Sequence, residues 1–139
     1  MVDVNNIRGV VSPALGAVII GYEVARQLKK DFIFTERMEG KMTIKRGFEI
    51  EEGAKYVVVE DVFTTGGSTQ EVVEVVENGG GQVILAVSIA QRQKDLQLKV
   101  PHQSLLLLEL PMYDAKECPL CKKGIPLVVP GTTISKLKK

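Results

Sequence analysis

Tryptophan is absent from this chain of 139 residues, histidine occurs once, and aromatic residues make up only 5% of the sequence. Charge of one sign is lacking too, because 18 lysines and arginines nearly balance 17 aspartates and glutamates and leave a formal net charge of +1. Neither a basic surface for nucleic acid nor an acidic tail for a cationic partner is therefore indicated. We expect the ligand to be a small molecule.

Long hydrophobic runs are missing as well. A stretch such as Val83–Ala90 is far shorter than the roughly 20 apolar residues that a membrane helix needs. The first residues, MVDVNNIRG, have neither the basic segment nor the apolar core of a secretion signal. Since 45% apolar and 25% charged residues are ordinary proportions for a folded chain, we expect one cytoplasmic domain over residues 1–139 that does not enter a membrane.

Cysteine is equally scarce. Cys118 and Cys121 are the only two, and they form a single CxxC motif rather than a disulfide framework. The pair fits half of a zinc site completed by another subunit, or a redox pair. With no further cysteine or histidine nearby, we favour two reduced thiols without a metal. The one histidine, His102, is predicted to lie in a surface loop beside Pro101.

Short β-branched and apolar runs, by contrast, are frequent. A helix is indicated over residues 17–30 by the spacing of Ile20, Val24 and Leu28. Continuous apolar runs are typical of strands buried on both faces of a parallel sheet. The alternation of such runs with crossover helices predicts an α/β fold, with a mostly parallel, twisted sheet flanked by helices. The predicted buried strands are Ile7–Val11, Asp31–Thr35, Lys55–Glu60, Gln82–Ala90 and Ser104–Leu108.

A second helix is predicted to begin at Ser68, where the sequence Ser-Thr-Gln-Glu matches a capping box. Asn78 and the three glycines after it are expected to end this helix, because glycine accepts the left-handed cap. Its buried side is predicted to consist of Val72, Val73, Val75 and Val76.

Residues 36–53 are different, since they are charged and contain three glycines. We interpret them as an exposed excursion, with Met42–Ile44 as one strand of a loose hairpin. A long polar loop inside a compact domain is usually functional or disordered.

The segment that points to chemistry is Asp61–Ser68, DVFTTGGS, which follows the strongest predicted strand. Its two glycines let backbone N–H groups approach an anion, and the helix that follows adds partial positive charge. Its hydroxyl side chains can donate to phosphate oxygens. Just upstream, Glu60 adds a second carboxylate to that of Asp61, which suits the hydroxyls of a ribose or a magnesium ion.

Two simpler interpretations of this segment are less consistent with its residues. A strand-to-helix turn with a good cap explains TGGS alone but not the preceding Glu-Asp and threonine pair. The segment also lacks the lysine of a Walker A motif and the spacing of GxGxxG. We therefore predict a sugar-phosphate site.

The stretch Tyr56–Ser68, YVVVEDVFTTGGS, resembles the signature of type I phosphoribosyltransferases, which bind phosphoribosyl diphosphate (PRPP). The flanking segments resemble the orotate branch of that family. VVSPALGAVIIGYEVARQL is similar to the stretch before the signature, and TERMEGKMTIKRGF is similar to the mobile loop. AVSIAQRQ and the tail CPLCKKGIPLVVPG are similar to bacterial enzymes. The resemblance implies a type I phosphoribosyltransferase fold, with residues 36–53 as a mobile catalytic loop.

The resemblance also implies roles for individual residues. Arg37 and Lys41 match basic positions of the mobile loop and, with Asp61, are the expected catalytic residues. Thr64 and Arg92 are expected to contact orotate, the guanidinium pairing with its carboxylate; without the resemblance, Arg92 is a solvated arginine after a strand. The diphosphate loop would be Pro13, Ala14, Leu15 and Gly16. PRPP would be bound by Glu60, Asp61, Val62, Phe63, Thr64, Thr65, Gly66, Gly67 and Ser68.

The implied reaction is substitution at the sugar C1, in which orotate displaces diphosphate from Mg-PRPP and gives orotidine 5′-phosphate, a step of UMP and pyrimidine biosynthesis. Mg²⁺ would be carried by PRPP, with no direct protein ligand. A homodimer is implied, since the mobile loop of the resembled enzymes reaches the partner's site.

Three departures from the family's pattern leave alternatives open. The N-terminal helical segment that usually contacts orotate is not in this sequence, Met38 stands where many relatives have lysine, and Gly16 stands where some do. The alternatives are a phosphoribosyltransferase for a purine base, and a non-catalytic protein that binds PRPP or a nucleotide for regulation.

Overall fold

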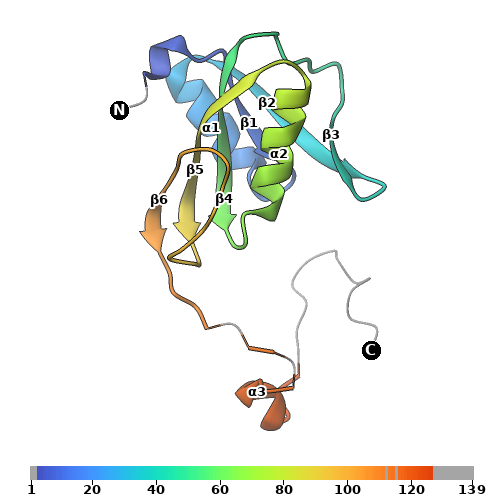
Figure 1. The fold of residues 1–139 in the computed structure, drawn as a ribbon, viewed down its shortest axis with the longest axis vertical. Coiled ribbons are helices and arrows are strands. Elements are labelled where there is room, and N and C mark those ends of the chain that lie inside the picture. The colour runs from blue at the N-terminus through green and yellow to red at the C-terminus, as the bar shows by residue number, and fades with distance from the viewer. Residues whose placement is uncertain (1–2, 112, 115, 127–139) are drawn as a thin grey trace.

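The computed structural model describes residues 3–111, 113–114 and 116–126, so residues 127–131 of the tail quoted above lie outside it. Figure 1 shows one sheet with helices packed against it. Strand order in the sheet is β3-β2-β1-β4-β5-β6. Along the chain the elements are η1 (Val4–Asn6), β1 (Gly9–Pro13), α1 (Val18–Leu28), β2 (Asp31–Met38), β3 (Lys41–Ile44), β4 (Lys55–Phe63), α2 (Gly67–Asn78), β5 (Gln82–Gln91), β6 (His102–Leu107) and α3 (Pro119–Lys122).

The predicted α/β class and mostly parallel sheet are confirmed. All neighbouring strands pair in parallel except β2 and β3. These two form a hairpin whose turn consists of Glu39 and Gly40, with φ angles of 49° and 83°. Positive φ at both central residues is the geometry of a tight two-residue turn that suits the twist of the strands.

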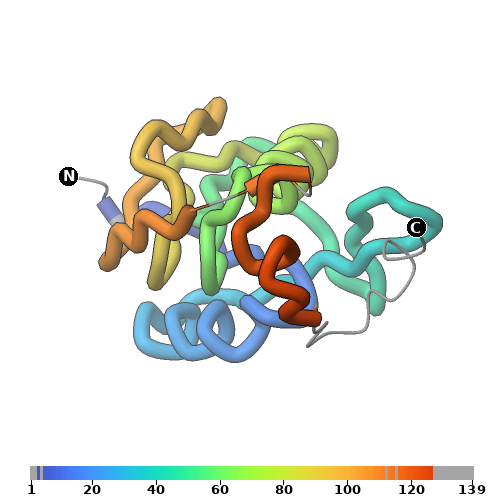
Figure 2. The backbone as a smooth tube through the Cα atoms, turned by 90° about the horizontal axis from the view of Figure 1, so that it is seen from below, coloured from blue at the N-terminus to red at the C-terminus, as the bar shows by residue number. Residues whose placement is uncertain are grey.

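Two apolar layers sandwich the sheet, with α1 on one face and α2 on the other (Figure 2). Strand β4 shows why its sequence is continuously apolar. Tyr56 and Val58 pack on the α2 side, whereas Val57 and Val59 pack on the α1 side. Because successive side chains of a strand point to opposite faces, a strand covered on both faces needs an apolar residue at every position.

The start of α2 differs from the prediction. The helix begins at Gly67, its N-cap is Gly66, and no side chain caps it, so the capping box at Ser68 is wrong. Gly66 has a φ of 79°, a left-handed conformation that glycine adopts without steric cost. The turn out of β4 thus needs a glycine at position 66. The sequence pattern places the cap two residues later, at Ser68.

The predicted end of α2 is confirmed. Gly80 takes the left-handed conformation with a φ of 87°. Its N–H donates to the Glu77 carbonyl (3.0 Å), and the Gly81 N–H donates to the Val76 carbonyl (3.0 Å). This is the Schellman pattern that satisfies the last carbonyls of a helix. Of the four predicted valines, Val75 is only half-buried.

Strand β6 is where the prediction of buried strands is wrong. Leu105 is 83% exposed, and Leu106, Leu107 and Leu108 are each about half exposed. The reason is position, because β6 is an edge strand and α1 and α2 pack over the strands before it. An apolar run does not reveal whether a helix covers the strand.

Residues 36–53 are more ordered than a loose excursion. Strand β2 continues to Met38, and the predicted hairpin strand is confirmed as β3. Met42 and Ile44 of β3, and Phe48 and Ile50 after it, pack against the α2-side core. The segment therefore extends the sheet and covers part of its core. Among the described residues, no helix is long and apolar enough to cross a bilayer.

Candidate active site

The candidate site lies where β4 turns into α2, at the end of the sheet to which β4, β5 and β6 point in Figure 1. Residues Glu60 to Thr69 line a cavity of about 190 Å³ there. The first N–H groups of a helix have no partner within the helix, so α2 directs its free donors and its positive dipole end at this cavity. The predicted phosphate-binding segment thus has the geometry of an anion site.

Gly66 is fixed in this turn by more than its backbone angle. A Cβ at Gly66 would lie 2.7 Å from the Cδ2 atom of Leu98, in the connection from β5 to β6. At Gly67, in contrast, the nearest atom to a Cβ would be the Thr65 hydroxyl at 3.6 Å. The turn is therefore packed on one side and open on the side of the cavity.

Two carboxylates stand at the entrance of the turn. Glu60 is only 7% exposed, and burial raises its pKa to about 8, with a further contribution from the neighbouring carboxylate of Asp61. The Asp61 N–H donates to Glu60 Oε1 (3.3 Å), and this bond and the nearby Thr69 hydroxyl both lower this pKa. Ionising the buried Glu60 beside the half-buried Asp61 is therefore unfavourable, and positive or hydroxyl groups of a ligand would relieve this cost.

The predicted diphosphate loop lies against the same carboxylates. A Cβ at Gly16 would be 2.6 Å from Asp61 Oδ2, so the loop after β1 approaches the end of β4 closely. The Ala14 N–H donates to the Thr35 carbonyl (2.8 Å), and the Ala14–Leu15 peptide is cis. Since β1 and β4 are adjacent parallel strands, their carboxyl ends meet at one edge, where ligands bind in α/β sheets.

Arg92 is also brought to this edge. Its backbone N–H donates to the carbonyl of Phe63 (2.9 Å), which places it beside the turn that follows β4. Its Nε atom is buried and has no hydrogen-bond partner among the described residues. A buried donor without a partner is rare and costly, and a ligand carboxylate is one group that would satisfy it.

The predicted loop cations lie elsewhere. Arg37 is on β2, where its Nη2 atom contacts Glu71 Oε2 of α2 (2.5 Å) and its Nη1 atom donates to the Gly40 carbonyl (2.6 Å). Lys41 lines a shallow pocket with Glu71 and Glu74. Neither cation lines the cavity of Glu60 to Thr69, so a catalytic role for them requires movement of the hairpin, which stays a prediction.

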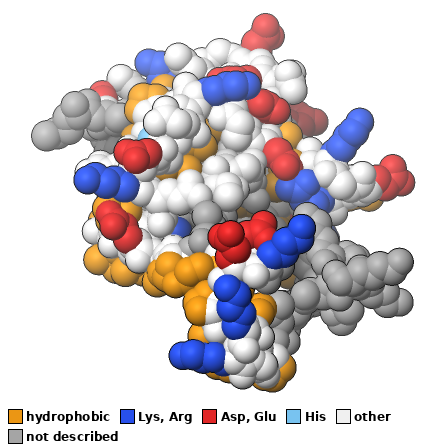
Figure 3. All heavy atoms as spheres, turned by 60° about the horizontal axis from the view of Figure 1, so that its bottom comes forward, with side chains coloured by type: hydrophobic (Ala, Val, Ile, Leu, Met, Phe, Trp, Pro, Cys, Tyr) orange, Lys and Arg blue, Asp and Glu red, His pale blue; other side chains and the backbone are white. Residues whose placement is uncertain are grey.

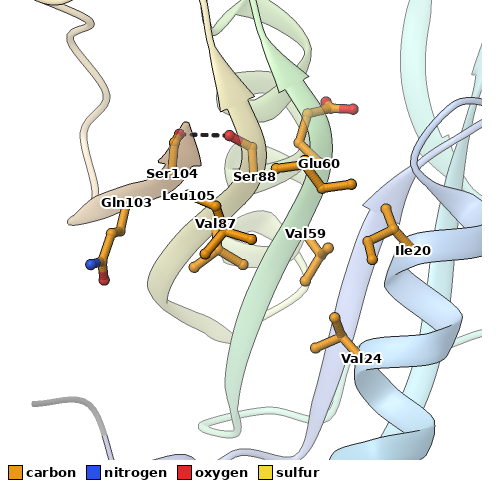
Figure 4. Close-up of a pocket in the computed structure, with 10 residues that line it drawn as sticks. Ile20, Val24, Val59, Glu60, Val87, Ser88, Gln103, Ser104 and Leu105 are labelled. Atoms are coloured by element: carbon orange, nitrogen blue, oxygen red, sulfur yellow. Dashed lines mark hydrogen bonds between the residues drawn. The ribbon is translucent and has the colours of Figure 1, made fainter. Parts of the chain in front are cut away.

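Sequence reasoning missed an apolar groove of about 310 Å³ beside Glu60, on the α1 side of the sheet. Figure 4 shows Ile20 and Val24 of α1 on one side of it and Val87 of β5 on the other. At its β6 side the hydroxyls of Ser88 and Ser104 form a hydrogen bond of 2.6 Å. The signal was present in the sequence, since each of these serines interrupts or borders an apolar run.

Thr69 was missed as well. Its side chain is buried and, with Glu60, lines the cavity, and its hydroxyl lowers the pKa of Glu60. As for metals, no group of three or more histidine, cysteine, aspartate or glutamate side chains gathers in the described part of the chain.

Comparison with known proteins agrees with this geometry. The phosphoribosyl transferase domain family matches residues 3–106. The orotate phosphoribosyltransferase of Caldicellulosiruptor bescii is 49% identical over 124 residues, which are 88% of this chain and 65% of that protein. The enzyme of the same name from Thermotoga maritima is 48% identical over 128 residues, which are 91% of this chain and 68% of that protein. The chain thus spans about two thirds of the length of these relatives.

Solved structures show the same fold. The orotate phosphoribosyltransferase of Aeropyrum pernix has a TM-score of 0.65 at 23% identity, covering 76% of this chain and 63% of that chain. An adenine phosphoribosyltransferase of Rhodothermus marinus has a TM-score of 0.61 at 24% identity, covering 73% and 70%. At these identities the likeness concerns the arrangement of strands and helices and does not distinguish one base from another.

Proposed function

We propose, from the premise that this chain belongs to the phosphoribosyl transferase domain family, that it transfers the 5-phosphoribosyl group of PRPP to orotate. The products are orotidine 5′-phosphate and diphosphate, in cytoplasmic pyrimidine biosynthesis. The observation that carries the proposal is the convergence of the β4–α2 turn, the Glu60–Asp61 pair and the loop Pro13–Gly16 at one edge of the sheet. The names of the sequence relatives support orotate as the base.

In this proposal the turn binds the 5-phosphate of PRPP. The backbone N–H groups and hydroxyls of Thr64 to Ser68 donate to the phosphate oxygens, and the dipole of α2 favours the negative charge. Glu60 and Asp61 accept hydrogen bonds from the ribose hydroxyls. The loop Pro13–Gly16 faces the diphosphate, and its closeness to Asp61 supports a leaving group that lies beside the sugar.

Orotate is bound by Arg92, whose guanidinium pairs with the orotate carboxylate, together with Thr64. The protein has little covalent chemistry to perform, so rate enhancement comes from alignment and from stabilisation of the departing charge. Arg37 and Lys41 provide that stabilisation once the hairpin moves towards the site, in a homodimer. The carboxylates of Glu60 and Asp61 fit a magnesium ion that is carried by the diphosphate. The ion would neutralise charge on the leaving group.

Substitution of Arg92 tests the base assignment. Loss of a charge-assisted hydrogen bond costs roughly 1.5–3 kcal/mol, so Arg92→Gln should raise the KM for orotate by about 10- to 100-fold and leave the Kd of Mg-PRPP unchanged. Arg26→Gln is the matched control, because Arg26 lies on α1 and pairs with Glu23. An unchanged KM for orotate in Arg92→Gln would contradict the role of Arg92.

Base-dependent release of diphosphate from Mg-PRPP tests the reaction itself. Orotate should support release, whereas adenine and hypoxanthine should not. Turnover with a purine base alone would show that the base assignment is wrong, and PRPP binding without turnover on any base would indicate a regulatory protein.

A further inference from the structure

The two cysteines lie outside the candidate active site. Cys118 precedes α3 and Cys121 lies within it; this helix follows the stretch of chain beyond β6 and stands apart from the sheet in Figure 1. In Figure 3 this part of the molecule projects at the bottom of the view, with hydrophobic and basic side chains on its surface. Cys121 is exposed and Cys118 is half-buried, so both sulfur atoms are within reach of a dissolved reagent.

Local hydrogen bonds hold the two residues on one turn. Cys118 is the N-cap of α3, and its carbonyl accepts from the Lys122 N–H (3.1 Å). The Cys121 carbonyl accepts from the Gly124 N–H (3.0 Å). Pro119 occupies the first helical position, where its fixed φ favours the helix. Residues three apart on a helical turn share one face, so the turn keeps the two side chains together.

The two thiols are chemically unequal. Hydrogen bonds from the backbone N–H and then the thiol of Cys121 lower the pKa of Cys118, and the Leu120 N–H adds to this. The same thiol contact raises the pKa of Cys121. An accessible thiol whose pKa is lowered by a second thiol beside it is the arrangement of redox-active cysteines, in which one attacks and the other resolves.

This turn supplies too few ligands for a structural metal ion. A structural zinc site needs four ligands, whereas no cluster of even three suitable side chains occurs in the described parts of the chain. A disulfide, in contrast, needs only the two sulfurs that the turn already brings together.

We propose that Cys118 and Cys121 form a thiol–disulfide redox pair that reacts with low-molecular-weight disulfides of the glutathione type. The Cys118 thiolate attacks one sulfur of the disulfide and forms a mixed disulfide, and one thiolate leaves. Cys121 then loses its proton and attacks Cys118, which forms the Cys118–Cys121 bond and releases the second thiol. The protein dithiol is oxidised by two electrons and the small disulfide is reduced to two thiols, so atoms and electrons balance.

The test uses the full chain and oxidised glutathione, followed by alkylation with N-ethylmaleimide and mass spectrometry. Because the sequence has no other cysteine, the number of added labels counts these two thiols directly. The wild type should become lighter by two hydrogen atoms and accept no label, with no disulfide between chains. Reduced glutathione in excess should restore two labels.

Single variants distinguish the roles of the two thiols. Cys121→Ser should stop at the mixed disulfide and carry one glutathionyl group. Cys118→Ser should react severalfold more slowly at neutral pH, because the remaining thiol lacks the backbone donors that favour the thiolate. Unchanged far-UV circular dichroism of both variants would show that they fold.

Four results would overturn the proposal. They are two labels retained after exposure to the disulfide, a stable glutathionyl adduct on the wild type, a disulfide between two chains, and one zinc ion retained per two chains that protects the thiols from reaction.

Discussion

Replacing Glu60 by a side chain that cannot ionise should stabilise the protein, because burial of the Glu60 carboxyl group is unfavourable. Glu60→Gln keeps the size of the side chain and its capacity to accept from the Asp61 N–H, but it cannot ionise. Because the pKa of Glu60 is about 8 in the folded protein, against an ordinary value of 4.5, the folded chain binds this proton more tightly than the unfolded chain does. Raising the pH between these two values therefore removes stability.

The magnitude follows from the shift. One pKa unit corresponds to 1.36 kcal/mol, and pH 7 lies about 2.5 units above the ordinary pKa, so keeping Glu60 protonated in the folded protein costs about 3 kcal/mol at pH 7. At pH 5 most of this cost is absent. The free energy of unfolding of Glu60→Gln should thus exceed that of the wild type by an amount that grows by about 2–3 kcal/mol from pH 5 to pH 7 and levels off above pH 8.

Urea unfolding of both proteins at pH 5, 6, 7 and 8 measures this difference directly. PRPP and Mg²⁺ are left out, because a bound cation would favour the ionised carboxylate. Comparing the two proteins at each pH cancels the other titrating groups. Glu77→Gln is the control, since Glu77 is an exposed glutamate of α2. A stability difference between Glu60→Gln and wild type that stays constant from pH 5 to pH 8 would refute the reasoning.

Four further substitutions test other parts of the structure. Gly66→Ala should cost about 1–3 kcal/mol of stability in urea unfolding, because the φ of Gly66 is positive and Leu98 blocks the Cβ. Gly67→Ala should be nearly neutral. Equal effects of the two substitutions would contradict the packing of the turn. Glu71→Gln should change stability by less than about 1 kcal/mol, since the pair of Glu71 with Arg37 is exposed. The substitution should tighten Mg-PRPP binding severalfold in calorimetry, because it frees Arg37. Unchanged affinity would argue against a role for Arg37. Leu106→Ala should cost no more than about 0.5 kcal/mol, as expected of a surface position, and a cost of 2 kcal/mol or more in urea unfolding would mean that β6 is covered.

The sheet was predictable because its central strand carries an unambiguous pattern. Strand β4 is apolar at consecutive positions and is followed by glycines and a helical stretch, so its burial on both faces and its place before the site follow from local physics. The convergence of Gly16 with Asp61 was expected only in outline, since parallel strands end at one edge, and the closeness of the contact depends on loop conformation.

The errors have physical causes as well. At Ser68 the capping pattern was satisfied in sequence, but the turn after β4 placed the left-handed residue at Gly66 and started the helix without a side-chain cap. At β6 the leucines predicted burial, although burial depends on what packs over an edge strand. For the groove beside Ser88 and Ser104, the two serines in apolar runs were the signal in the sequence, but its walls depend on which strands α1 covers, and that is decided by the tertiary packing.

Nuclear magnetic resonance of the ¹⁵N-labelled chain, titrated with Mg-PRPP, tests the central claim most directly. The backbone amides of Thr64 to Ser68 should shift and saturate together, with those of Leu15 and Gly16, while the amides of α3 stay in place. Saturable shifts confined to other parts of the chain, with the amides of the β4–α2 turn unchanged, would contradict the assignment of this turn as the phosphoribosyl site.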